Sequence, residues 1–176
     1  EIEQSYEQAE EWYRRAAEAG DPAGMLGLGR GYEEGYDDQE TAVEWYRQAA
    51  EAGNAEAQYA LGNRYYFGEG VEQDYALAVE WYQKAVEGGN IDAMNNLAYC
   101  YELGQGVEQD YARAIEWYQR AADTGHAEAM NNLGFAYEYG KGEEQNSAQA
   151  VEWYRRAVDA GSIDAMNNLG FAYEYG

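Results

Sequence analysis

The sequence predicts an all-α repeat protein built from pairs of helices, and two sets of regularly spaced residues support this prediction. The five tryptophans stand at positions 12, 45, 81, 117 and 153, with spacings of 33, 36, 36 and 36 residues. A glycine recurs in the same phase at positions 20, 53, 89, 125 and 161. A period of this length indicates stacked repeats, each of which is one supersecondary unit.

Each repeat contains two segments of helical periodicity, which we call helix A and helix B. In the third full repeat, helix A covers residues 90–103 and helix B covers residues 111–123. The apolar residues of this helix A share one face at helical spacing: Ala93, Met94, Leu97, Ala98 and Tyr101. The stripe of this helix B is Ala114, Trp117, Tyr118, Ala121 and Ala122. We therefore expect both helices to bury one side against their neighbours.

The repeat phase divides the chain into successive units of one solenoid domain, residues 1–176. We expect helix B of a partial repeat at 1–20, full repeats at 21–53, 54–89, 90–125 and 126–161, and helix A of a partial repeat at 162–176. The first full repeat is three residues shorter than the others, because it passes from Gly35 directly to the segment 36–38.

Residues that favour helix N-termini precede the expected helices, since their side chains accept hydrogen bonds from unpaired backbone N–H groups. Helix B follows Ser5, Asp38, Asp74, Asp110 and Asn146. Helix A follows Asp21, Asn54, Asn90 and Ser162, and His126 is the exception in that position. The recurring glycines end helix B, where a left-handed residue is needed. The Gly-x-Gly segments at 68–70, 104–106 and 140–142 are interpreted as helix ends and turns, because no strand precedes them as a phosphate-binding loop requires.

Composition excludes several classes of function. The chain has 11 basic and 34 acidic residues, a net charge of −23. We therefore expect no direct binding to nucleic acid or to an anionic membrane, since both require clustered Lys and Arg. No apolar run is long enough for a transmembrane helix, and the first residues do not resemble a targeting segment. The sequence thus predicts a soluble protein and leaves its compartment open.

The residues offer little material for a catalytic or metal site. Cys100 and His126 are the only cysteine and histidine. We expect Cys100 to be an inert, largely buried thiol and His126 to cap a helix at the surface. Zinc requires several Cys or His ligands, and no calcium-loop sequence occurs. We therefore expect no enzyme, no cofactor and no specific metal.

The repeated sequence resembles the Sel1-like repeat family. The resemblance rests on Ala-x-x-x-Leu-Gly-x-x-Tyr, then Gly-x-Gly-Val-x-x-Asp, then Ala-x-x-Trp-Tyr-x-x-Ala-Ala-x-x-Gly, and covers essentially the whole chain. It implies a right-handed αα superhelical solenoid related to the tetratricopeptide repeats, and a non-catalytic, often bacterial, interaction scaffold. The family's disulfide-bonded members are not implied, because residues such as Met94 and Val86 stand where their cysteines would be.

The resemblance also implies that the A helices line a concave groove. On the face away from the core, the A helices carry three columns of residues at spacings of four and three, so that the columns are neighbours on one stripe. From the third full repeat on, the stripe repeats Asn, an aromatic residue and Glu. The predicted partner-binding residues are Tyr59, Asn63, Tyr66, Asn95, Tyr99, Glu102, Asn131, Phe135, Glu138, Asn167, Phe171 and Glu174. We expect the amides to bond the backbone of an extended peptide, the aromatic residues to take its side chains, and the glutamates to attract Lys or Arg.

Three alternatives remain open from the residues alone. The first alternative is that one asparagine of each Asn-Asn pair bonds the adjacent repeat instead of a peptide. The second alternative is a structural unit that stacks head to tail. It rests on residues expected to expose apolar surface near the two ends: Met166, Leu169 and Tyr173 near one, and Trp12 and Tyr13 near the other. A weaker alternative is an acidic mimic that occupies a nucleic-acid-binding protein. The leading prediction is a scaffold for a protein or an extended peptide, with a preference for a basic one.

Overall fold

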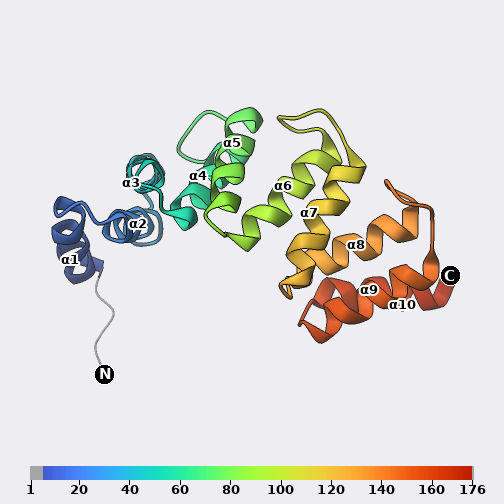
Figure 1. The fold of residues 1–176 in the computed structure, drawn as a ribbon. Helices are drawn as coiled ribbons and strands as arrows, with labels where there is room; N and C mark the ends of the chain where they lie inside the picture. The colour runs from blue at the N-terminus through green and yellow to red at the C-terminus, as the bar shows by residue number, and fades with distance from the viewer. Residues whose placement is uncertain (1–5, 176) are drawn as a thin grey trace, which may run out of the picture. The chain divides into compact units, whose positions relative to one another are not determined.

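The computed structural model describes residues 6–175, and this part of the chain folds into α-helices without a strand (Figure 1). The B helices are α1 (Tyr6–Glu18), α3 (Gln39–Glu51), α5 (Tyr75–Glu87), α7 (Tyr111–Asp123) and α9 (Ser147–Asp159). The A helices are α2 (Pro22–Arg30), α4 (Ala55–Phe67), α6 (Ile91–Leu103), α8 (Ala127–Tyr139) and α10 (Ile163–Tyr175). A π-helical segment, η1 (Gly31–Gly35), continues α2. The predicted all-α repeat fold is confirmed.

The chain divides into two compact units, residues 1–90 and residues 91–176. In the first unit each helix from α1 to α5 packs against the next one along the chain. In the second unit the same holds from α6 to α10. Each unit is thus a series of packed A and B helices.

The structure shows capping hydrogen bonds for most of the predicted N-caps at the described helix starts. Asp38 accepts from the Thr41 backbone N–H at 3.1 Å, and Asp74, Asp110 and Asn146 cap the later B helices in the same way. His126 caps α8 as expected, because its Nδ1 accepts from the Ala129 backbone N–H at 3.1 Å. Ser5 lies outside the described residues.

The glycine that closes each B helix adopts the left-handed conformation that the sequence predicts. Its φ lies between 86° and 96° at all five positions, where a residue with a Cβ would be strained. Gly68 and Gly140 are left-handed C-caps of α4 and α8, which confirms that the Gly-x-Gly segments are helix ends and turns.

The shorter first repeat closes by a different route. In the full-length repeats, the backbone N–H of the B-helix cap donates to a tyrosine carbonyl nine residues earlier, as from Asp74 to Tyr65 at 2.9 Å. In the first repeat, Asp38 donates to Tyr32, only six residues earlier, at the same distance. The wider π turn of η1 therefore replaces the Gly-x-Gly loop and keeps the same closing hydrogen bond.

The core is built from tyrosine, leucine and alanine. One tyrosine of each described full repeat is almost completely buried, and we call these four the core tyrosines: Tyr46, Tyr82, Tyr118 and Tyr154. At three of them, Tyr46, Tyr82 and Tyr154, a glycine lets the ring approach the A helix closely. A Cβ on Gly134 would lie 2.5 Å from the Tyr154 ring, and one on Gly62 would lie 2.6 Å from the Tyr82 ring. Close approach at small residues thus allows a chain poor in large aliphatic residues to bury apolar surface.

The predicted core face of α6 is largely correct. Ala93, Leu97, Ala98 and Tyr101 are buried, whereas Met94 is only half-buried. Cys100, which the sequence placed outside this face, is completely buried as well. The buried side of α6 is therefore wider than a single helical stripe.

Candidate partner-binding surface

The predicted partner-binding residues lie on A helices of both units. In the first unit they are the α4 residues Tyr59, Asn63 and Tyr66. In the second unit they lie on α6, α8 and α10: Asn95, Tyr99, Glu102, Asn131, Phe135, Glu138, Asn167, Phe171 and Glu174. Their three columns differ in exposure and in hydrogen bonding.

The most exposed apolar residues of the second unit's stripe form a column on three successive A helices. Tyr99, Phe135 and Phe171, which we call the aromatic column, expose 43%, 36% and 58% of their surface. One helical turn further on, Leu103 and Tyr139 are also exposed, and the rings of Phe135 and Tyr139 are 4.4 Å apart. Leu103 and Tyr139 are not among the predicted partner-binding residues, although their i, i+4 spacing from the aromatic column places them beside it.

The asparagine column joins neighbouring repeats. Asn132 Nδ2 donates to Asn95 Oδ1 at 3.2 Å, and Asn168 Nδ2 donates to Asn131 Oδ1 at 2.9 Å. Asn95 is buried, so its side chain does not lie on an open surface as the sequence analysis expected. Asn131 is half-buried and Asn167 on α10 is exposed. In two of the three pairs, at 131–132 and 167–168, one asparagine thus bonds the preceding repeat, which is the alternative left open above.

The glutamate column accepts hydrogen bonds from the core tyrosines. The Tyr118 hydroxyl donates to Glu102 Oε2 at 2.9 Å, and the Tyr154 hydroxyl donates to Glu138 Oε2 at 2.6 Å. Burial, with the adjacent carboxylate as a second cause, raises the pKa of both tyrosines well above the usual range. These glutamates therefore satisfy buried phenols in addition to carrying charge, whereas Glu174 on α10 is exposed.

A cation compensates two of the tyrosine-bound glutamates. Lys141 Nζ lies 2.8 Å from Glu102 Oε1 and 4.7 Å from the ring centre of Phe135. In the first unit, Arg64 pairs with Glu33, which accepts from the Tyr46 hydroxyl. Sequence reasoning missed Lys141 because it lies in a Gly-x-Gly loop, outside the helical columns. Lys141 connects the aromatic column to the glutamate column.

The α4 residues make the corresponding contacts with different chemistry. Tyr66 occupies the glutamate position and packs edge-on against Tyr75, with ring centres 5.1 Å apart. The acceptor for the Tyr82 hydroxyl is Asn63 Oδ1, at 2.7 Å. The ring centre of Tyr59 lies 6.2 Å from that of Tyr82. These side chains therefore contribute to internal packing, and the aromatic column continues only in the second unit's helices.

Neither candidate for nucleophilic or acid–base chemistry lies in a reactive setting. Burial raises the pKa of the Cys100 thiol to about 12. His126 Nε2 lies 3.1 Å from Asp92 Oδ1, while its other ring nitrogen caps α8. Within residues 6–175, no three His, Cys, Asp or Glu side chains are grouped so that they could hold a metal ion. Searching the same residues reveals no helix with the length and hydropathy to cross a membrane.

The arrangement of paired helices in repeats of 33–36 residues defines the class of α-helical repeat proteins. More specifically, the chain belongs to the Sel1 repeat family, whose model matches residues 1–21, 22–54, 55–90, 91–126, 127–162 and 163–176. Members of this family generally serve as non-catalytic scaffolds for protein–protein interaction. Among curated proteins, none matches the chain.

Solved structures with related sequences share this fold. A protective antigen present in uropathogenic Escherichia coli strains is 40% identical, with a TM-score of 0.88 over 93% of this chain and 36% of that chain. A Sel1 repeat protein from Oxalobacter formigenes is 34% identical, with a TM-score of 0.86 over 91% of this chain and 65% of that chain. An immunity protein from Pseudomonas aeruginosa shows the fold alone, at 22% identity and a TM-score of 0.61 over 94% of this chain and 61% of that chain. The chain thus spans less than two thirds of each relative.

Proposed function

We propose that the second unit binds an extended segment of a partner protein along the stripe formed by α6, α8 and α10. The aromatic column is the observation that carries this proposal. Its three large rings are substantially exposed at equivalent positions of successive repeats, and Leu103 and Tyr139 widen the apolar surface. A contiguous exposed apolar strip on a repeat protein is typical of an interaction surface.

The surrounding charges favour a basic partner. The chain carries a net charge of −23, and the glutamate column runs beside the aromatic column. Lys141 compensates Glu102 on α6, whereas Glu174 on α10 is exposed. We therefore expect the apolar side chains of the partner to contact the rings, and its Lys or Arg residues to lie toward α8 and α10.

Selection from a display library of random short linear peptides tests this proposal. Selected peptides should combine apolar and basic residues. Replacing Phe135 and Phe171 together with Ala should weaken their binding at least about tenfold, which corresponds to about 1.4 kcal/mol. Trp12→Ala is the matched control, because Trp12 is an exposed aromatic residue of the other unit. Selected peptides that bind both variants equally well would contradict the proposal.

Head-to-tail self-association is the second candidate. Large apolar side chains are exposed on two helices: Trp12 and Tyr13 on α1, and Ile163, Met166 and Tyr173 on α10. The sequence predicted this exposure for each of them except Ile163. Leu169, for which exposure was also predicted, is half-buried. A contact between these two helices of different molecules would be heterologous and would build open chains. Light scattering at increasing concentration tests this candidate. A strict monomer, unchanged by Tyr173→Glu, would exclude it.

A further inference from the structure

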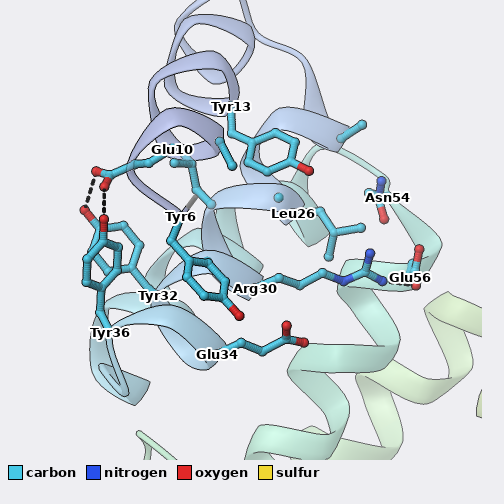
Figure 2. A pocket seen from close by; sticks show the side chains of 15 residues that line it. Tyr6, Glu10, Tyr13, Leu26, Arg30, Tyr32, Glu34, Tyr36, Asn54 and Glu56 are labelled. Atoms are coloured by element: carbon cyan, nitrogen blue, oxygen red, sulfur yellow. Dashed lines mark hydrogen bonds and ion pairs between the residues drawn. The ribbon is translucent and has the colours of Figure 1, made fainter. Parts of the chain in front are cut away.

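The first unit contains a pocket of about 510 Å³ between α1, α2, η1 and the start of α4. This volume lies within the roughly 300–1,000 Å³ typical of small-molecule sites. Figure 2 shows Tyr6 and Tyr13 projecting from α1 on one side, and Leu26 and Arg30 of α2 on the other. The pocket lies in the other unit from the aromatic column, so it is separate from the proposed peptide surface.

Tyrosine dominates the walls of this pocket. Tyr6, Tyr13, Tyr32 and Tyr36 all line it, and all except the half-buried Tyr32 are exposed. Aromatic rings attract cations through the negative potential of their faces. The protein already places cations over tyrosine rings elsewhere, as with Arg64, which lies 5.8 Å from the ring centre of Tyr46.

The charges at the pocket are predominantly negative. Glu10, Glu34 and Glu56 line it together with a single cation, Arg30, and Arg14 lies behind Glu10. Arg30 forms an ion pair with Glu56, and Arg14 forms one with Glu10, so that Glu34 is the lining carboxylate whose charge no ion pair among the described residues compensates. Glu10 also remains ionised, because its hydrogen bonds with Arg14, Tyr36 and Tyr32 lower the pKa of its carboxyl group.

We propose that this pocket binds an alkylammonium group, with the tyrosine rings contacting its alkyl carbons and Glu34 compensating its charge. A neutral apolar ligand would contact the rings but would leave Glu34 without a counter-charge. An anion would face the excess of negative charge. The combination of four tyrosines with the uncompensated Glu34 therefore selects an organic cation with apolar surface, either a free quaternary amine or the side chain of a lysine.

Gly31 provides a way to block the pocket without disturbing the fold. It lines the pocket with helical dihedral angles, φ −61° and ψ −43°, and a Cβ built on it meets no atom within 4 Å. Leucine is therefore compatible with this backbone and would extend into open space. Gly170 on α10 is the matched control, since it is also helical and a Cβ there also meets nothing within 4 Å.

Titration calorimetry with choline tests the inference. We expect saturable binding to the full chain with a Kd of about 1 mM or tighter. Gly31→Leu should abolish this binding, Gly170→Leu should leave it unchanged, and Glu34→Gln should weaken it severalfold. The uncharged analogue of choline, with a tert-butyl group in place of the trimethylammonium group, should bind about tenfold more weakly or worse.

Two further arms distinguish the source of the cation and keep the inference falsifiable. A short acetylated peptide with one lysine should bind more tightly than choline if the natural ligand is a side chain, and more weakly if it is a free amine. When choline is added, chemical shift changes in amide NMR spectra should be largest for residues of α1, α2 and η1. This measurement locates the binding site without relying on any variant. Equal binding of choline and its uncharged analogue, equal binding to Gly31→Leu, or no saturable binding of either cation would overturn the proposal.

Discussion

Tyr118→Phe removes one hydroxyl group from the centre of the second unit. The ring is buried, and its hydroxyl donates to Glu102 Oε2 at 2.9 Å. Phenylalanine keeps the apolar contacts of the ring, so the substitution isolates the hydrogen bond. Glu102 retains its ion pair with Lys141 after the change.

The expected loss follows from the charge of the acceptor. A hydrogen bond to an ionised group contributes about 1.5–3 kcal/mol to stability. Because Lys141 still compensates the carboxylate, we expect the lower part of this range, about 1.5–2 kcal/mol. For a chain of this size, the thermal midpoint should fall by about 3–8 °C.

Urea denaturation followed by circular dichroism measures this effect. Tyr99→Phe is the matched control, because Tyr99 is exposed and its hydroxyl contributes about 0.5 kcal/mol or less. A double-mutant cycle with Glu102→Leu isolates the pairwise energy, because leucine cannot accept the hydrogen bond. The double variant should lose less stability than the sum of the two single losses.

The reasoning would be refuted if Tyr118→Phe were as harmless as Tyr99→Phe. The hydrogen bonds from the core tyrosines to the glutamate column would then not stabilise the fold, and the carboxylates would contribute only to the charge of the surface. A loss that persisted in full in the Glu102→Leu background would also contradict it, because that background offers the hydroxyl no acceptor at this position.

Three other outcomes are expected. Asn95→Ala should destabilise the protein by about 1–3 kcal/mol, because it leaves Asn132 without its acceptor. Asn167→Ala should be neutral or slightly stabilising, since Asn167 is exposed and alanine favours helix. Equal effects of the two variants in denaturation curves would contradict the inter-repeat role of Asn95. Burial raises the folded-state pKa of three core tyrosines, so that above pH about 10 the unfolded chain binds fewer protons than the folded chain. The free energy of unfolding should therefore fall above that pH and not below it. Tyrosinate absorbance from these residues should appear together with unfolding, and their ionisation before unfolding would contradict their burial. A selected basic peptide should associate more slowly as salt is raised above the physiological range, because the net charge of −23 attracts it at long range; a salt-independent on-rate in stopped-flow measurements would assign recognition to the aromatic column alone.

The repeat phase, the helix ends and most of the core face follow from local chemistry, and the sequence by itself determined them. An N-cap such as Asp38 bonds an N–H three residues away, and the closing glycines act through their own dihedral angles. Such interactions recur with the period and are visible in one dimension. The exposure of the aromatic column also follows from its place opposite the core face.

The hydrogen-bond partners of the asparagine and glutamate columns were decided by the tertiary structure alone. The partner of Asn95 lies 37 residues away on the next A helix, and the partner of Glu102 is a tyrosine 16 residues away. Periodicity shows that such residues recur on one face, but the hydrogen bond depends on how closely two helices approach. The pocket beside Gly31 has the same origin, because it exists only where α1, α2 and α4 leave space between their side chains. Local propensity acts within about one helical turn, whereas burial and the pairing of distant polar groups are set by packing.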